Sequence, residues 1–172
     1  YWPDDAAGTL FKVDDHFEYN DSMGHNHWDA YLRWQGYDKE EYRWNWKLRT
    51  NEKEDDYSDF LDFVYFMDPT RTGDATFDAQ AEDVLDVDEW LRVLSVRFLI
   101  DDWDTLGYNR GKNAYIYKPY HKGDGPPDDP PRYGKWTLLP WDSDLTFGNA
   151  SAPIVSSKFP SIKRMLERPE FQ

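Results

Sequence analysis

The strongest structural signals are in two segments, DDWDTLGYNRGKNAYIY (residues 101–117) and KWTLLPWDSD (residues 135–144). Residues 113–117 are rich in aromatic and β-branched side chains, which is typical of a strand, and residues 135–139 have a similar composition. A loop rich in Pro, Gly and Asp, residues 118–134, joins the two. We therefore predict a β-hairpin that carries carboxylates at both of its outer ends.

A long helix is predicted directly before this hairpin, over about residues 86–101. Asp86 suits the N-terminal cap of such a helix. At its other end, Asp101 and Asp102 are expected to be solvated. Its apolar stripe, which we expect to face the core, contains Trp90, Leu91, Leu94, Ser95, Phe98 and Leu99.

The rest of the chain gives weaker signals, with no internal repeat and no second domain. A helix is predicted at residues 58–67, which Asp68 and Pro69 end. Residues 40–48 fit neither a helix nor a strand clearly. The remaining expectations are a strand at residues 8–13, a helix from about residue 162, a polar loop at 70–76, and a loop with short strand pieces at 16–36.

Composition excludes several classes of protein. The 172 residues carry 34 acidic and 20 basic side chains, a net charge of −14, which argues against nucleic acid or an anionic membrane as the main partner. An aromatic content of 18% excludes a disordered acidic tail. The absence of cysteine excludes disulfides, Cys-ligated zinc and thiol catalysis. No apolar run reaches the length of a membrane span.

Four polar residues flank the predicted hairpin and the helix before it: Asp104, Asn113, Asp142 and Asp144. Folding the hairpin brings its outer ends together, so an amide oxygen and carboxylates can converge there. If the chain stays extended after the second strand, the i, i+2 spacing puts the last two carboxylates on one face. Oxygen ligands of this kind suit Mg²⁺ or Ca²⁺ rather than zinc or copper.

The order of these residues along the chain matches the order of functional residues in a known class of enzyme. In kinase-like phosphotransferases a catalytic-loop Asp accepts the proton of the attacking hydroxyl, and an Asn a few residues later holds a metal ion. A hairpin then leads to another Asp, which chelates the metal on the nucleotide phosphates. The same order appears here as Asp104, Asn113, strand, turn, strand and Asp142.

With these motifs in hand, the sequence resembles the CotH kinase family, the spore coat protein H type of atypical protein kinase. The resemblance covers nearly the whole chain from about Gly8. The paired aromatic–Asp motifs are its most specific part. The matching pieces are GTLFK (8–12), DDYSD (55–59), VLDVDEWL (84–91), DWD (102–104), KNAYIY (112–117), LPWDSD (139–144) and FG (147–148).

The resemblance implies an α+β, atypical protein-kinase-like fold and ATP-dependent phosphorylation of Ser or Thr on a protein substrate, with Mg²⁺ or Mn²⁺. Asp104 then corresponds to the catalytic aspartate. Asn113 and Asp142 correspond to the residues that bind the metal and its nucleotide, and Asp144 to a second metal ligand or a support. We further expect Trp103 and Trp141, directly before two of these residues, to wedge the backbone against the core.

The sequence departs from the family pattern at one point. The nucleotide-binding lobe, with its phosphate-contacting Lys, should precede residues 8–12 and is not in this chain, so Lys12 is not given that role. We therefore expect residues 1–172 to be a single partial domain, mainly the helical lobe and the catalytic hairpin, cut at both ends. The family resemblance points to spore or cell surfaces, outside the cell, as the location.

Two other functions remain open at this point. The chain could be a non-catalytic member, a spore-coat or cell-surface structural or adhesion protein that keeps the fold. It could also be a Ca²⁺-dependent extracellular module that uses its Asp and Trp content to bind carbohydrate. Phosphate transfer, nucleotide binding without transfer, and calcium-dependent glycan binding would distinguish the three.

Overall fold

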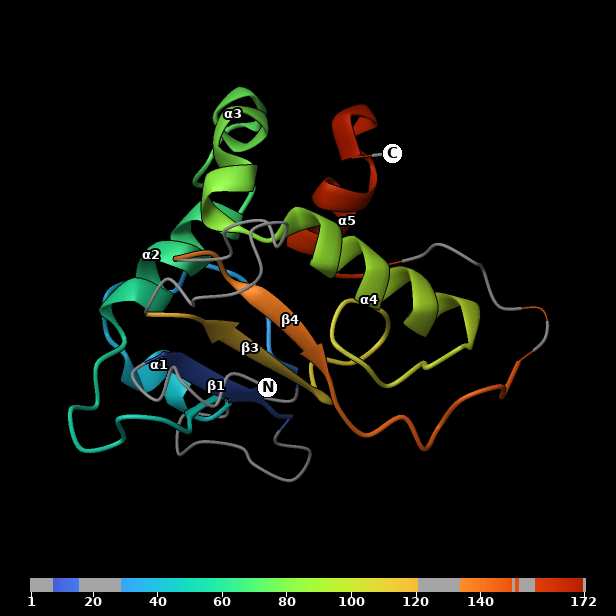
Figure 1. Cartoon of the computed structure of the whole chain (residues 1–172), viewed down its shortest axis with the longest axis horizontal. Coiled ribbons are helices and arrows are strands. Elements are labelled where there is room, and N and C mark those ends of the chain that lie inside the picture. The colour runs from blue at the N-terminus through green and yellow to red at the C-terminus, as the bar shows by residue number, and fades with distance from the viewer. Residues whose placement is uncertain (1–7, 16–28, 121–133, 150, 152–156, 172) are drawn as a thin grey trace, which may run out of the picture.

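The computed structural model describes residues 8–15, 29–120, 134–149, 151 and 157–171. Most of the predicted loop at 118–134, and residues 16–28 of the predicted loop at 16–36, lie outside this described part. The described residues form an α+β fold, in which helices pack on a four-stranded antiparallel sheet (Figure 1).

The sheet has the strand order β2-β1-β3-β4. Its strands are β1 (Thr9–Val13), β2 (Trp46–Leu48), β3 (Ala114–Lys118) and β4 (Thr137–Pro140). β3 and β4 pair antiparallel, which confirms the predicted hairpin. β1 pairs with β3, so a strand from the start of the chain lies against the hairpin and continues its sheet.

Six helical segments accompany the sheet in the described part of the chain. They are α1 (Glu40–Arg43), α2 (Ser58–Met67), α3 (Asp74–Val84), α4 (Val87–Leu99), α5 (Pro160–Leu166) and the 3₁₀ turn η1 (Pro169–Phe171). The predicted bounds of α2 are confirmed. None of the helices within the described ranges has the length and apolar character needed to cross a membrane.

The prediction of a polar loop at residues 70–76 is wrong from Asp74 onward, because α3 begins there. This helix buries only Phe77 and Ala81, so its sequence carries little of the apolar period that marks a helix. Residues 40–48, which fitted no single pattern, contain a short helix followed by a strand.

Helix α4 begins at the predicted cap, where the Asp86 side chain accepts a hydrogen bond from the Glu89 amide at 3.2 Å. Trp90, Leu94 and Phe98 on this helix are buried as predicted. The predicted stripe is wrong for Ser95 and for Leu99, which is 71% exposed. Arg97 occupies the buried face instead and is only 3% exposed.

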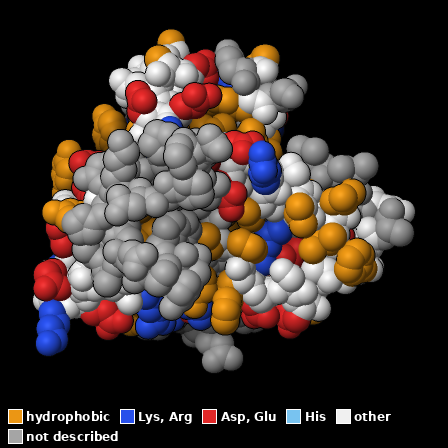
Figure 2. Space-filling model, in the orientation of Figure 1, with side chains coloured by type: hydrophobic (Ala, Val, Ile, Leu, Met, Phe, Trp, Pro, Cys, Tyr) orange, Lys and Arg blue, Asp and Glu red, His pale blue; other side chains and the backbone are white. Residues whose placement is uncertain are grey.

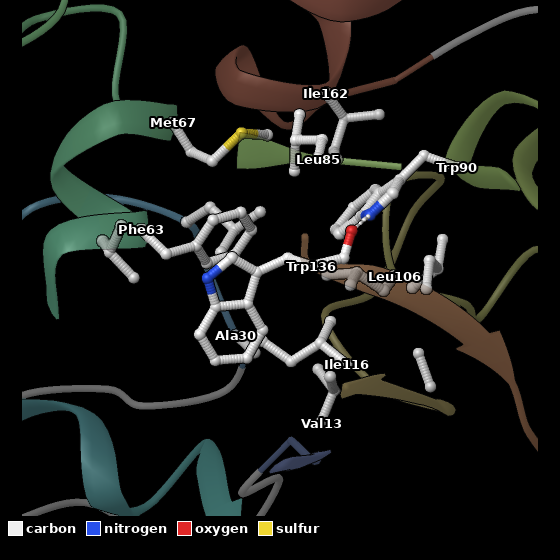
Figure 3. Close-up of a cluster of buried hydrophobic side chains, with 14 of the residues drawn as sticks. Val13, Ala30, Phe63, Met67, Leu85, Trp90, Leu106, Ile116, Trp136 and Ile162 are labelled. Atoms are coloured by element: carbon white, nitrogen blue, oxygen red, sulfur yellow. Dashed lines mark hydrogen bonds between the residues drawn. The ribbon is translucent and has the colours of Figure 1, made fainter. Parts of the chain in front are cut away.

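The core lies between the sheet and helices α2 and α4, with Trp136 at its centre (Figure 3). The Trp136 ring stacks on Phe63 of α2, with 5.0 Å between ring centroids. Its carbonyl oxygen accepts a hydrogen bond from Trp90 Nε1 of α4 at 2.8 Å. Trp136, directly before β4, therefore contacts both helices that pack on the sheet.

Asp29 holds the loop before β3 to two other parts of the chain. Its Oδ1 accepts hydrogen bonds from the Gly111 amide at 2.7 Å and from Arg110 Nε at 3.0 Å, and its Oδ2 from Lys158 Nζ at 2.8 Å. Gly111 itself has no room for a side chain, because a Cβ there would collide with the backbone of Ala30. This loop is thus fixed from outside as well as by the sheet.

We expect Asp29→Asn to lower the free energy of unfolding at pH 7 by about 1.5–3 kcal/mol, the range for hydrogen bonds to a charged group. Burial raises the pKa of Asp29, but the hydrogen bonds from Lys158, Gly111 and Arg110 outweigh it and leave that pKa below its ordinary value. A carboxylate whose folded pKa is depressed stabilises the fold above its unfolded pKa of about 3.9, and this contribution disappears as the pH falls through the folded pKa.

Urea unfolding of both proteins at pH 7 and at successive values below pH 4 measures this effect. The difference in unfolding free energy between wild type and Asp29→Asn should shrink as the pH falls. A difference that stays constant through the acid range would contradict the assignment.

Candidate functional site

Three segments meet at one end of the sheet: the segment that follows α4, the residues just before β3, and the residues just after β4 (Figure 1). The hairpin register pairs Ala114 with Pro140, and the Trp141 amide donates a hydrogen bond to the Asn113 carbonyl oxygen at 3.2 Å. Asn113 and Asp142 are therefore placed at the same end of the hairpin, as predicted.

Asp104 lies in the segment after α4 and is 1% exposed. Its Oδ2 accepts a hydrogen bond from Asn113 Nδ2 at 3.1 Å and pairs with Lys112 Nζ at 2.8 Å. Its Oδ1 is buried, and no hydrogen-bond donor in the described ranges reaches it. The structure thus brings together two predicted site residues, Asp104 and Asn113, and leaves one buried carboxylate oxygen of Asp104 without a hydrogen bond from the described residues.

Lys112 also belongs to this site through its ion pair with Asp104, although no role was predicted for it. Burial lowers the pKa of the Lys112 amine, but its hydrogen bond and attraction to Asp104 outweigh burial, so that pKa is raised. The amine is therefore a cation at neutral pH. Its side chain is 27% exposed, so it gives the buried Asp104 carboxylate a charged neighbour that reaches solvent.

Asp142 and Asp144 lie after β4, and both are exposed. The strand ends at Pro140, and Asp142 has a φ of 53°, in the left-handed region, so the extended spacing that would put both carboxylates on one face does not occur. Asp142 lies near enough to Arg97 to attract it, and Asp144 near enough to Asp102 to repel it. Both carboxylates therefore lie within electrostatic range of the same buried ion pair.

The expectation that Asp101 and Asp102 are solvated is wrong. Asp101 is 9% exposed and accepts hydrogen bonds from Tyr108 Oη at 3.1 Å and from the Asn149 amide at 2.8 Å. Asp102 is fully buried and forms an ion pair with Arg97, with 2.8 Å between Oδ2 and Nε. Burial raises the pKa of Asp102, and the Arg97 cation opposes that shift.

The expectation that Trp103 and Trp141 wedge the backbone against the core is also wrong. They are 39% and 52% exposed, and the Trp141 ring contacts Tyr115 edge-on at 5.5 Å. Leu99 and Phe147 are also exposed in this part of the chain. Figure 2 shows hydrophobic side chains gathered on the right-hand part of the surface, where α4 ends. The site therefore borders an apolar surface.

The candidate metal-ligand atoms at the site are oxygens, which Mg²⁺ and Mn²⁺ prefer. The unpartnered Oδ1 of the buried Asp104 and the exposed carboxylate of Asp142 are compatible with such an ion. No three His, Asp or Glu side chains among the described residues are grouped closely enough to form a metal cage. Magnesium in phosphotransfer sites needs no such cage, since one or two carboxylates and the substrate phosphates hold it.

Comparison with known protein families identifies the family of the chain. The family model described as CotH kinase protein matches residues 4–172. No curated protein matches the chain. The match spans the sheet, the helices and all three segments of the site, and the chain belongs to the CotH kinase protein family.

Proposed function

We propose that the natural protein transfers the γ-phosphoryl group of ATP to a Ser or Thr hydroxyl of a protein substrate. The buried Asp104 carboxylate supports this proposal most strongly, because Asn113 and Lys112 hold one of its oxygens while no described donor reaches the other. A carboxylate held in this way is suited to receive a proton at a defined position.

In the proposed reaction, the substrate hydroxyl oxygen forms a bond to the γ-phosphorus, and the bond from that phosphorus to the β–γ bridging oxygen breaks. ADP leaves, and Asp104 Oδ1 receives the hydroxyl proton. Asn113 Nδ2 and Lys112 Nζ keep the carboxylate in place through its Oδ2. Catalysis of this kind consists mainly of positioning and charge stabilisation.

Asn113 and Asp142 are the residues we propose to hold Mg²⁺ or Mn²⁺ with the nucleotide, and Asp144 is a second ligand or a support. The ion neutralises charge on the transferred phosphoryl group. Asn113 donates its Nδ2 to Asp104, so its side-chain oxygen remains available as a ligand. We place the protein at the spore or cell surface, as the family resemblance implies.

The direct test incubates the full-length natural protein with γ-labelled ATP, Mg²⁺ or Mn²⁺, and a Ser-rich acceptor protein. Label on Ser or Thr of the acceptor, absent in Asp142→Ala, is the expected result. ATP binding without transfer would favour a structural or adhesion protein that keeps the fold. Calcium-dependent retention on glycans without nucleotide binding would favour a carbohydrate-binding module.

Lys112→Met is expected to lower the rate of transfer about tenfold or more. The variant removes a hydrogen bond between charged groups, typically worth about 1.5–3 kcal/mol, and about 1.4 kcal/mol corresponds to a factor of ten. Lys163→Met is a matched control, since the Lys163 side chain is 59% exposed and pairs only weakly, at 3.7 Å, with Glu167. Equal activity of the two variants in a steady-state assay would argue against a role for Lys112.

A further inference from the structure

Arg97 is a buried cation on α4 that the proposed reaction does not use. Its side chain is 3% exposed, although it stands on the face where Trp90, Leu94 and Phe98 pack in the core. Burying a guanidinium is costly unless its donors are satisfied and its charge is matched. The contacts of this side chain therefore need an explanation.

The guanidinium of Arg97 contacts all three segments of the site. On the segment after α4 it forms the ion pair with Asp102 and a hydrogen bond to Thr105 Oγ1. Just before β3 it donates to the Asn113 carbonyl oxygen, with Nη1 at 2.5 Å. After β4 it donates from Nη2 to the Trp141 carbonyl oxygen at 2.5 Å and to Ser143 Oγ at 3.1 Å.

These acceptors lie beside residues of the proposed site. Thr105 follows Asp104, the Asn113 carbonyl belongs to a proposed metal ligand, and Asp142 lies between Trp141 and Ser143. Ser143 Oγ donates in turn to Asp102 Oδ2 at 3.2 Å, which closes a ring of contacts between the first and the last segment. Arg97 thus joins the segment that carries Asp104 to the segment that carries Asp142.

At these residues the backbone lies outside the regular strands, and a backbone hydrogen bond, from the Trp141 amide to the Asn113 carbonyl oxygen, joins the two segments. Asn113 and Asp142 have φ angles of 55° and 53°, in the left-handed region. β3 begins directly after Asn113, and β4 ends two residues before Asp142. A planar guanidinium has five donors in a fixed fork and can satisfy several carbonyl groups at once. An ammonium is a compact charge and cannot span the same set of acceptors.

We propose that Arg97 is a positioning residue that sets the location of the Asp104 segment relative to the Asp142 segment. The functional part of this proposal rests on the phosphotransfer function proposed above. Arg97 contacts neither substrate in this account and acts through Asp102, Asn113 and the backbone at Trp141.

Arg164 offers a matched control. It is likewise a buried arginine, 7% exposed, that donates to three backbone carbonyl groups, those of Thr72, Phe66 and Met67, at 2.6–3.0 Å. Its guanidinium lies 3.9 Å from the centre of the Phe77 ring on α3. Arg164→Lys therefore also removes a buried guanidinium group, but at a position where none of the described contacts of that group is with a proposed site residue.

The experiment compares wild type, Arg97→Lys and Arg164→Lys by hydrogen exchange and by binding and transfer with Mn²⁺ and ATP. We expect Arg97→Lys to speed amide exchange in residues 101–106 and 141–149 about tenfold, with little change in α2. The dissociation constant for Mn²⁺ in the presence of ATP should rise about tenfold and kcat should fall. Arg164→Lys should change exchange near residues 66–73 and leave Mn²⁺ affinity within about twofold.

The outcomes separate this proposal from the proposed function. Unchanged exchange in both site segments of Arg97→Lys, or Mn²⁺ affinity and kcat equal to those of wild type, would overturn the positioning role. An equal loss of Mn²⁺ affinity in Arg164→Lys would mean that Arg97 contributes only to stability, and this result would also overturn the positioning role. A wild-type protein that neither binds Mn²⁺ with ATP nor transfers phosphate refutes the proposed function, and the exchange result then decides the structural part alone.

Should Arg97→Lys fail to fold, Ser143→Ala provides a milder change. Ser143 is exposed, and its hydroxyl joins Arg97 to Asp102. We expect this variant to speed exchange in residues 141–149 at least twofold while the thermal midpoint stays that of wild type. Unchanged exchange in the folded variant would overturn the proposed link.

Discussion

Replacing Asp104 with alanine is expected to lower the rate of phosphoryl transfer by about 10²- to 10⁴-fold, the range for removal of a general base. The Asp104 side chain is 1% exposed, and its Oδ1 is the carboxylate oxygen that no described donor reaches. In the alanine variant, bulk water has poor access to this buried position and cannot take over the role of the base. The loss should appear in kcat, because the group acts on the reacting hydroxyl, while the KM for ATP changes little.

Two variants control this experiment. Asp104→Asn keeps the shape of the side chain and removes its basicity, so it should be nearly as inactive as Asp104→Ala. Asp88→Ala removes a carboxylate that is 70% exposed and pairs with Arg92 at the surface, and it should keep wild-type activity. Substantial transfer by Asp104→Asn, in a protein with a native circular dichroism spectrum, would mean that Asp104 is not the base.

Trp136→Ala is expected to produce the largest loss of stability, about 3–5 kcal/mol. The ring is 2% exposed, stacks on Phe63 of α2, and lies 6.2 Å from Phe11 of β1. Its removal leaves a cavity where the sheet meets α2, and the surrounding side chains can relax only in part. Chemical denaturation monitored by circular dichroism measures the change in unfolding free energy.

Trp44→Ala is the matched control, because Trp44 is 41% exposed and its truncation opens no cavity in the core. We expect it to cost less than about 1 kcal/mol, as surface substitutions usually do. A loss for Trp136→Ala no larger than that of Trp44→Ala would mean that the core is not arranged as described.

The hairpin and three of the helices, α2, α4 and α5, could be predicted because their signals are local. Aromatic and β-branched residues mark β3 and β4, and α2 combines a dense apolar composition with a stop at Asp68 and Pro69. Helix α3 could not be predicted in this way. It buries only Phe77 and Ala81, so its position depends on contacts with the rest of the fold.

The site was predictable where hairpin geometry alone determines proximity. Asn113 and Asp142 follow from the pairing of β3 and β4, and Asp104 follows from the short loop before Asn113. Asp144 was placed on an assumption of extended backbone that the φ of Asp142 does not meet. Their roles as catalytic residue and metal ligands stay predictions.

Arg97 was missed, although its position carries a signal. It stands seven residues after Trp90 and three after Leu94, on the apolar face of α4, where a charge is unusual. A charged residue at such a position predicts a buried partner. The nearest carboxylates in sequence are Asp101 and Asp102, and the structure pairs Arg97 with Asp102. The same reasoning would have shown that the end of this helix is buried.

The sheet order also affects when the protein can fold during its synthesis. β1 pairs with β2 and, over a longer register, with β3. β3 lies about 100 residues further along the chain, where Val13 pairs with Ala114. A ribosome must therefore translate most of this sequence before the central strands can meet. Until then β1 can pair only with the short β2, so Phe11 and Val13, fully buried in the finished protein, lack the cover of the hairpin and expose apolar surface.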